Sequence, residues 1–146
     1  MPLSDFIVEA DQQRIVEAIG KAERQTSGEI RVHIEPKCPH NDPMKRAAKV
    51  FDNLRMYETR QRNGVLVYIA YKSRMFAIIG DCGINDCVPD GFWNKEKDTL
   101  KAYLSQNRAA DGICEVIAQI GQSLSDYFPW ADDDVNEQSD DISYAE

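Results

Sequence analysis

The chain has 146 residues, which is enough for one domain with a single substantial hydrophobic core. Its composition is that of an ordinary globular protein, with 42% hydrophobic and 29% charged residues. No stretch approaches the roughly 18 consecutive apolar residues of a membrane helix. The first residues also lack the basic start and apolar run of a signal peptide. These features argue against a membrane span and predict a cytoplasmic protein.

The formal net charge of -8 is unevenly distributed along the chain. Seven of the 25 acidic residues lie after residue 130, where there is no Lys or Arg, so residues 1–130 carry 18 acidic and 17 basic residues. We therefore expect one domain over residues 1–130 and an acidic C-terminal tail over residues 131–146. Neither part offers the basic face that a phosphate backbone requires, which argues against a nucleic acid partner.

The first half of the sequence predicts a helix, a strand and a second helix. Ile15, Ile19 and Ala22 recur at helical spacing before Gly28 interrupts the pattern. Apolar and polar residues then alternate over residues 28–35, which is typical of a half-buried strand with His33 on its solvent-facing side. Asp42-Pro43 is a strong start signal for the next helix.

The second half predicts a hairpin followed by two helices. Residues 65–71 form a continuous apolar run, as expected for a strand covered on both faces. The two residues Lys72-Ser73 then predict a tight turn into a strand over residues 75–79. A loop over residues 80–91 precedes a helix over residues 92–106, and Asp111-Gly112 begins the last helix. This order of elements predicts an α/β protein with helices packed over a mixed sheet.

Carboxylates are concentrated in the loop that follows the hairpin. Asp81, Asn85, Asp86 and Asp90 lie within ten residues directly after a strand. Like charges at this spacing repel one another, and a bound cation removes that cost. Hard cations such as Ca²⁺ and Mg²⁺ take oxygen ligands of this kind. The alternative interpretation is that these residues only form turns and cap helices, as Asp111 would at the last helix.

The four cysteines give a weaker signal. Cys38, Cys82 and Cys87 lie in loops, and His40 is close to Cys38, whereas Cys114 falls within a helical pattern. The spacings do not match the usual zinc knuckles. Thiols of a cytoplasmic chain are normally reduced, so neither zinc nor a disulfide is the favoured interpretation.

Several segments together resemble the TPM domain family. They are residues 26–32, residues 62–68, residues 76–84, and Asp111-Gly112-Ile113 at the start of the last helix. Phe128-Pro129 and Asn136-Glu137 resemble the small stand-alone bacterial branch. The resemblance implies an αβα sandwich, with a central mixed sheet of about four strands flanked by helices on both faces. It also implies divalent ions bound at the sheet edge, and some plant members, which act in the thylakoid lumen and in photosystem II repair, are described as acid phosphatases.

The favoured functional hypothesis is a divalent-cation-binding domain with a structural or regulatory role. We expect Ca²⁺ before Mg²⁺, with room for more than one ion. In order of preference the expected ligands are Asp81 and Asp86, then Asp111 and Glu29, with Asn85 in the same loop and Glu137 or Asp134 closing the site if the tail folds back.

Two other functions stay open from the sequence. One is a metal-assisted phosphomonoesterase, in which Asp81 holds the metal or acts as nucleophile and Arg74 faces the phosphate. The sequence shows no Gly-x-Ser-x-Gly elbow and no His-Glu-x-x-His motif, so carboxylates and a metal would have to carry any reaction. The other is a metal-free interaction module whose acidic tail docks on an unidentified basic protein.

Overall fold

The computed structural model describes residues 6–130 and 139–144, and its core is a four-stranded mixed sheet. The strands are β1 (Glu29–Glu35), β2 (Gly64–Ala70), β3 (Met75–Gly80) and β4 (Ser143–Tyr144), in the spatial order β3-β2-β1-β4. β1 runs parallel to both β2 and β4, whereas β2 and β3 are antiparallel. The predicted α/β class and mixed sheet are confirmed.

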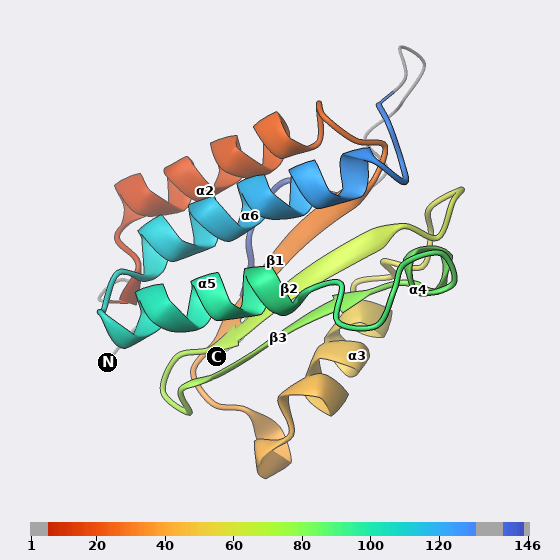
Figure 1. Ribbon diagram of the computed structural model, residues 1–146. Coiled ribbons are helices and arrows are strands. Elements are labelled where there is room, and N and C mark those ends of the chain that lie inside the picture. The colour runs from red at the N-terminus through yellow and green to blue at the C-terminus, as the bar shows by residue number, and fades with distance from the viewer. Residues whose placement is uncertain (1–5, 131–138, 145–146) are drawn as a thin grey trace.

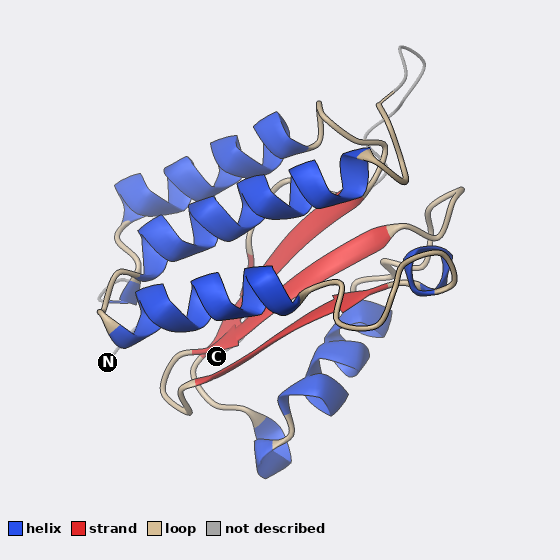
Figure 2. Ribbon diagram, viewed as in Figure 1, coloured by secondary structure: helices blue, strands red, loops and turns tan. Residues whose placement is uncertain are grey.

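Helices cover both faces of the sheet (Figure 1, Figure 2). On one face α2 (Glu9–Ala22), α6 (Ala109–Ser125) and α5 (Asn94–Ser105) lie side by side. On the other face α3 (Pro43–Asn53) packs on β2 and β3. The short α4 (Cys82–Asn85) follows β3, and the 3₁₀ turn η1 (Pro39–Asn41) precedes α3. The sandwich implied by the family resemblance is thus the observed architecture.

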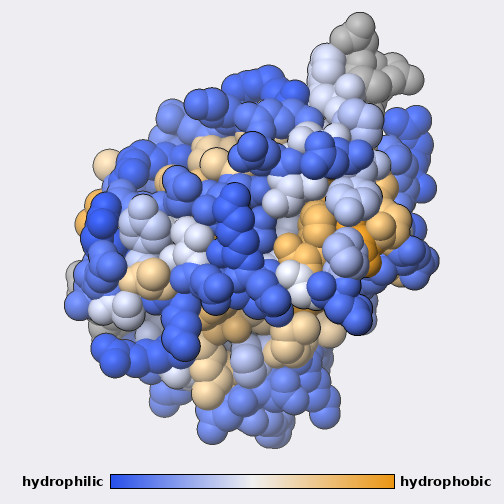
Figure 3. Space-filling view, viewed as in Figure 1, coloured by the Kyte–Doolittle hydropathy of each residue, from blue (hydrophilic) through white to orange (hydrophobic). Residues whose placement is uncertain are grey.

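The two faces of the sheet bury two separate apolar clusters. The larger one lies under the three helices and includes Ile19, Ile30, Val67 and Ile117. The smaller one lies under α3, where Val50 and Phe51 meet Leu66 of β2. From the side of α2, α5 and α6, hydrophilic residues cover most of the surface (Figure 3). None of the helices in the described parts of the chain has the length and apolar character needed to cross a membrane.

Most helix boundaries follow from local sequence signals. Asp42 caps α3 by accepting a hydrogen bond from the backbone N–H of Lys45 at 3.1 Å, and Pro43 occupies the first turn. The apolar stripe of α2 buries Ile15, Ile19 and Ala22 as its periodicity predicts. The last helix begins at Ala109, two residues before the predicted Asp111.

The structure corrects two local predictions about the strands. β1 is buried along almost its whole length on both faces. Only 5% of His33 is exposed, because its ring nitrogens contact Glu35 and Ser143 and its ring stacks on Tyr68. The hairpin loop has four residues rather than two, since Ala70 pairs with Met75. Arg74 at its end has a positive φ of 57°, which allows the chain to turn into β3.

The C-terminal segment returns to the sheet. β4 pairs with His33 and Ile34 of β1, and Ile142 before it is only 8% exposed. Part of the sequence predicted as an acidic tail therefore forms the edge of the sheet, while residues 131–138 lie outside the described part of the chain.

Candidate functional site

The structure places Asp81, the first predicted metal ligand, in an ion pair. Its carboxylate accepts hydrogen bonds from Arg62 Nε at 2.7 Å and from the terminal Arg62 nitrogen at 2.9 Å. It also caps α4 by accepting from the backbone N–H of Cys82 at 2.7 Å. Only 7% of Asp81 is exposed. Both carboxylate oxygens are therefore already used to hold α4 against the segment before β2.

The other predicted loop ligands stay local to α4. The Asn85 amide donates to the backbone carbonyl of Gly80 at 3.0 Å, and Asp86 forms the exposed C-terminal end of the helix. The predicted loop over residues 80–91 therefore contains a short helix, in which these side chains make turn and cap contacts.

Asp111 and Glu29 lie away from that loop. Asp111 pairs with Arg14 at 2.9 Å and with Arg108 at 3.2 Å in the first turn of α6. That end of α6 is on the opposite side of the domain from α4 (Figure 1). Glu29 pairs with Gly64 of β2, and Gly64 in turn contacts Asp81, so β2 separates the two acids by about 10 Å at ordinary strand spacing. Glu137 and Asp134 lie outside the described residues.

Glu29 nevertheless belongs to a group of carboxyl side chains. Glu23, directly after α2, lies within hydrogen-bonding reach of both Glu29 and Asp140. Its Oε2 also accepts from the backbone N–H of Ile30 at 2.9 Å. A Cβ on Gly20 would lie 3.5 Å from Asp140 Oδ2, so Asp140 reaches the last turns of α2. Two neighbouring segments and the distant C-terminal segment thus bring three carboxyl side chains to the beginning of β1.

Crowding among these three acids changes the protonation of Glu23. Burial raises the pKa of Glu23, and the hydrogen bond to Asp140 raises it further, to about 11. The N–H of Ile30 opposes this shift, whereas the hydrogen bond and negative charge of Glu29 add to it. Glu23 is therefore protonated at neutral pH, and its proton lowers the repulsion among the three acids.

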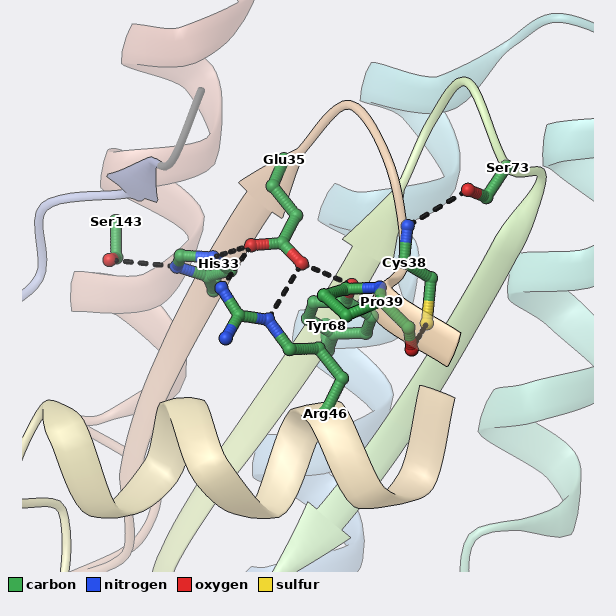
Figure 4. Close-up of polar contacts among 8 residues, drawn as sticks. All are labelled: His33, Glu35, Cys38, Pro39, Arg46, Tyr68, Ser73 and Ser143. Atoms are coloured by element: carbon green, nitrogen blue, oxygen red, sulfur yellow. Dashed lines mark hydrogen bonds and ion pairs between the residues drawn. The ribbon is translucent and has the colours of Figure 1, made fainter. Parts of the chain in front are cut away.

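A second polar network lies at the other end of β1, between the sheet and α3 (Figure 4). Glu35 Oε1 accepts from Arg46 at 2.7 Å and contacts His33 Nε2 at 3.0 Å. Glu35 Oε2 accepts from Arg46 Nε at 2.9 Å and from the Tyr68 hydroxyl. His33 Nδ1 in turn contacts Ser143 Oγ at 2.9 Å, which ties β4 to the network.

The charges in this network are fixed by its hydrogen bonds. Burial raises the pKa of Glu35, but the bonds from Arg46, Tyr68 and His33 outweigh it and hold the pKa at about 2. Burial lowers the pKa of His33 and raises that of Tyr68. Because both Glu35 oxygens are saturated, the network holds strands and helix together and offers no free base for chemistry.

Comparison with known proteins identifies the family of this chain. The family model described as the TPM domain matches residues 3–123. The chain belongs to the TPM domain family. Among solved structures, the BA42 protein from the psychrophilic bacterium Bizionia argentinensis has a TM-score of 0.91 and 40% identity, covering 99% of each chain. The N-terminal domain of the cg2496 protein from Corynebacterium glutamicum has a TM-score of 0.65 and 18% identity, covering 86% of this chain and 78% of that one, and shares the fold. No curated protein matches the sequence.

This TPM domain carries Asp140 beyond the family-model match, which ends at residue 123. The C-terminal segment is still shared with BA42, since that similarity covers 99% of both chains. Sequence reasoning missed Glu23, although it follows Ile15 and Ile19 at a spacing of four on the buried stripe of α2. An acid on an apolar stripe was the available signal.

The cysteines of the TPM domain form no cluster in the described part of the chain. All four are free, with Cys38 buried, Cys82 and Cys87 exposed, and Cys114 half-buried. Over residues 6–130 and 139–144, no set of three or more His, Cys, Asp or Glu side chains is arranged to hold a metal ion. Any cation bound by these residues must therefore draw its ligands into place.

Proposed function

We propose that the chain is a divalent-cation-binding TPM domain in which Glu23, Glu29 and Asp140 hold the ion, with Ca²⁺ preferred. The observation that supports this proposal is the meeting of these three carboxyl side chains at the beginning of β1, where Glu23 lies within hydrogen-bonding reach of the other two. Glu29 was expected from the sequence as a ligand, whereas Asp81 and Asp111 are each held by arginine.

The donor set suits a hard cation. Three carboxylates offer up to six oxygens, and Ca²⁺ accepts six to eight at about 2.4 Å in flexible geometry. Mg²⁺ requires a stricter octahedron and gives up its water reluctantly, so a set that must rearrange favours Ca²⁺. The ion supplies positive charge in place of the Glu23 proton. Binding is therefore coupled to proton release and strengthens as pH rises.

The consequence of binding would be structural. Glu23 ends α2, Glu29 begins β1, and Asp140 precedes β4, so one ion would join three segments. A ligand that binds only the folded state stabilises it by mass action, by about 2.7 kcal/mol at one hundred times its Kd. The ion would thus control how firmly the C-terminal segment lies on the sheet, which is a regulatory role.

The test is a Ca²⁺ titration of the full chain, followed by calorimetry and by amide NMR shifts. We expect shifts over residues 20–30 and 139–144, a raised Tm, and affinity lost in Glu23→Gln and Asp140→Asn. Asp86→Asn is the matched control, because Asp86 is an exposed acid that is not one of the three proposed ligands. Absence of any shift with Ca²⁺, Mg²⁺ and Mn²⁺, or loss of affinity in the control alone, would refute the proposal.

The phosphatase alternative has less support from the geometry. An attacking or metal-binding Asp81 would have to leave Arg62, which engages both of its oxygens. Hydrolysis of an aryl phosphate that disappears in Asp81→Asn would favour this alternative.

Deleting residues 131–146 distinguishes the cation-site proposal from the alternative in which the acidic tail docks on a basic protein. Lost cation affinity supports a ligand role for that segment, whereas lost partner binding at unchanged affinity supports docking.

A further inference from the structure

A cavity lies at the end of the domain opposite the three acids Glu23, Glu29 and Asp140. Its volume is about 410 Å³, and it is bounded by the hairpin loop between β2 and β3 and by the C-terminal half of α5. Ile69 and Ala70, the last residues of β2, form part of its wall. Glu29 aligns with the first residue of β2, so the length of the strand separates the cavity from the proposed cation site.

The walls of the cavity are largely apolar and partly aromatic. Phe6 stacks on Tyr71 with ring centroids 4.8 Å apart and an interplanar angle of 15°. Phe76 of β3 and Leu104 of α5 also line it. These four side chains pack against the main core but are only partly buried, so they leave apolar surface facing the cavity. A flat apolar group would remove that surface from water.

The charge of the cavity is opposite to that of the chain. Among the residues that the structure describes, Arg74 and Lys101 are the only charged ones that line it, although the chain has a net charge of -8. Within residues 6–130 and 139–144, neither side chain forms an ion pair. Arg74 comes from the hairpin loop and Lys101 from α5, so two separate elements place positive charge at one apolar cavity.

We propose that this cavity binds a small aromatic anion. Its ring would lie among Phe6, Tyr71 and Leu104, and its carboxylate or phosphate group would meet Arg74 and Lys101. The volume is within the range of about 300–1,000 Å³ that is usual for small-molecule sites. The guanidinium fork of Arg74 can give two parallel hydrogen bonds to either kind of anion, and Lys101 adds a mobile point charge.

The proposal is tested by amide NMR titration of the metal-free chain with phenyl phosphate and, separately, with benzoate. We expect saturable shifts confined to residues 69–76 and 101–107 with at least one of the two. Whichever anion binds more tightly identifies the preferred acidic group. Working in excess chelator separates this test from the proposed cation site, so either proposal can fail alone.

Two variants and one control define the role of charge. Arg74→Gln and Lys101→Gln should each weaken binding about fivefold, as expected for a partly exposed ionic contact. Lys95→Gln is the matched control, since Lys95 is an exposed lysine of α5 that does not line the cavity. Circular dichroism melting would verify that each variant is folded.

Two neutral or ring-free probes complete the design. Benzyl alcohol should bind more weakly than the anions, because it lacks the charge, and inorganic phosphate should bind more weakly because it lacks the ring. Equal binding of benzyl alcohol would refute the role of the cations. Equal binding of inorganic phosphate would refute the role of the apolar wall, and shifts spread over the whole chain would refute the site.

Discussion

The sharpest stability prediction concerns Glu35, whose carboxylate is at the centre of the buried network below α3. Replacing Glu35 with Gln keeps the shape of the side chain but removes the charge that Arg46, Tyr68 and His33 stabilise. The pKa of Glu35 falls from its ordinary 4.5 to about 2 in the folded state. At 1.36 kcal/mol per pH unit this corresponds to about 3 kcal/mol of stability near neutral pH.

The pH dependence follows from the direction of that shift. A carboxyl group with a lowered folded-state pKa contributes its stability above the unfolded value, and the contribution is lost as pH falls toward the folded value. The native chain should therefore exceed Glu35→Gln by about 3 kcal/mol at pH 7, or about 10 °C in Tm for a domain of this size. The difference should shrink between about pH 4.5 and pH 2.

Urea unfolding at several pH values, followed by circular dichroism, would measure this difference. Glu58→Gln is a suitable control because Glu58 forms an exposed surface pair with Arg55, and such pairs contribute less than about 1 kcal/mol. A Glu35→Gln chain as stable as the native one at pH 7 would contradict the reasoning. So would a deficit that stays constant down to pH 2, because it would not come from the ionised carboxylate.

Three further predictions concern Gly83 and Asp81, which follow β3, and Gly20 of α2. A Cβ on Gly83 would lie 2.1 Å from the carbonyl oxygen of Gln61, so Gly83→Ala should cost about 3 kcal/mol in urea unfolding. Gly20→Ala, where the nearest atom is at an ordinary 3.5 Å, should instead stabilise the helix by about 0.5–1 kcal/mol, and equal effects would contradict the packing argument. Asp81→Asn should cost about 1–2 kcal/mol through its lost ion pair and leave Ca²⁺ affinity unchanged. Calorimetry that finds Ca²⁺ affinity lost in Asp81→Asn would restore the loop after β3 as the cation site.

The layered fold was predictable because each element carries its own periodic signal. The apolar run of β2, the helix start at Asp42-Pro43 and the stripes of α2 and α6 all depend on neighbouring residues. β4 gave no comparable signal, since two residues are too few for a pattern. Its position depends on a contact between His33 and Ser143, which are 110 residues apart.

The polar side chains were harder to place, for a related reason. An alternating strand looks the same whether its polar face meets water or meets buried partners such as Arg46 and Tyr68. The loop acids illustrate the same point, because nothing near Asp81 in sequence identifies Arg62 as its partner. The cluster of Glu23, Glu29 and Asp140 forms only because the C-terminal segment returns to the sheet. The composition of that segment shows that it is acidic but does not show where it packs.

The position of β4 also bears on how the protein folds during synthesis. β1 belongs to the first quarter of the sequence, but within residues 6–130 and 139–144 its outer edge is paired by Ser143 and Tyr144 alone. Until the ribosome has released Ser143 and Tyr144, the outer edge of β1 presents unpaired N–H and C=O groups that can template a strand from another nascent chain. Early termination or a bulky C-terminal fusion would prolong that interval. The same closing strand would then become a point of strand exchange between molecules.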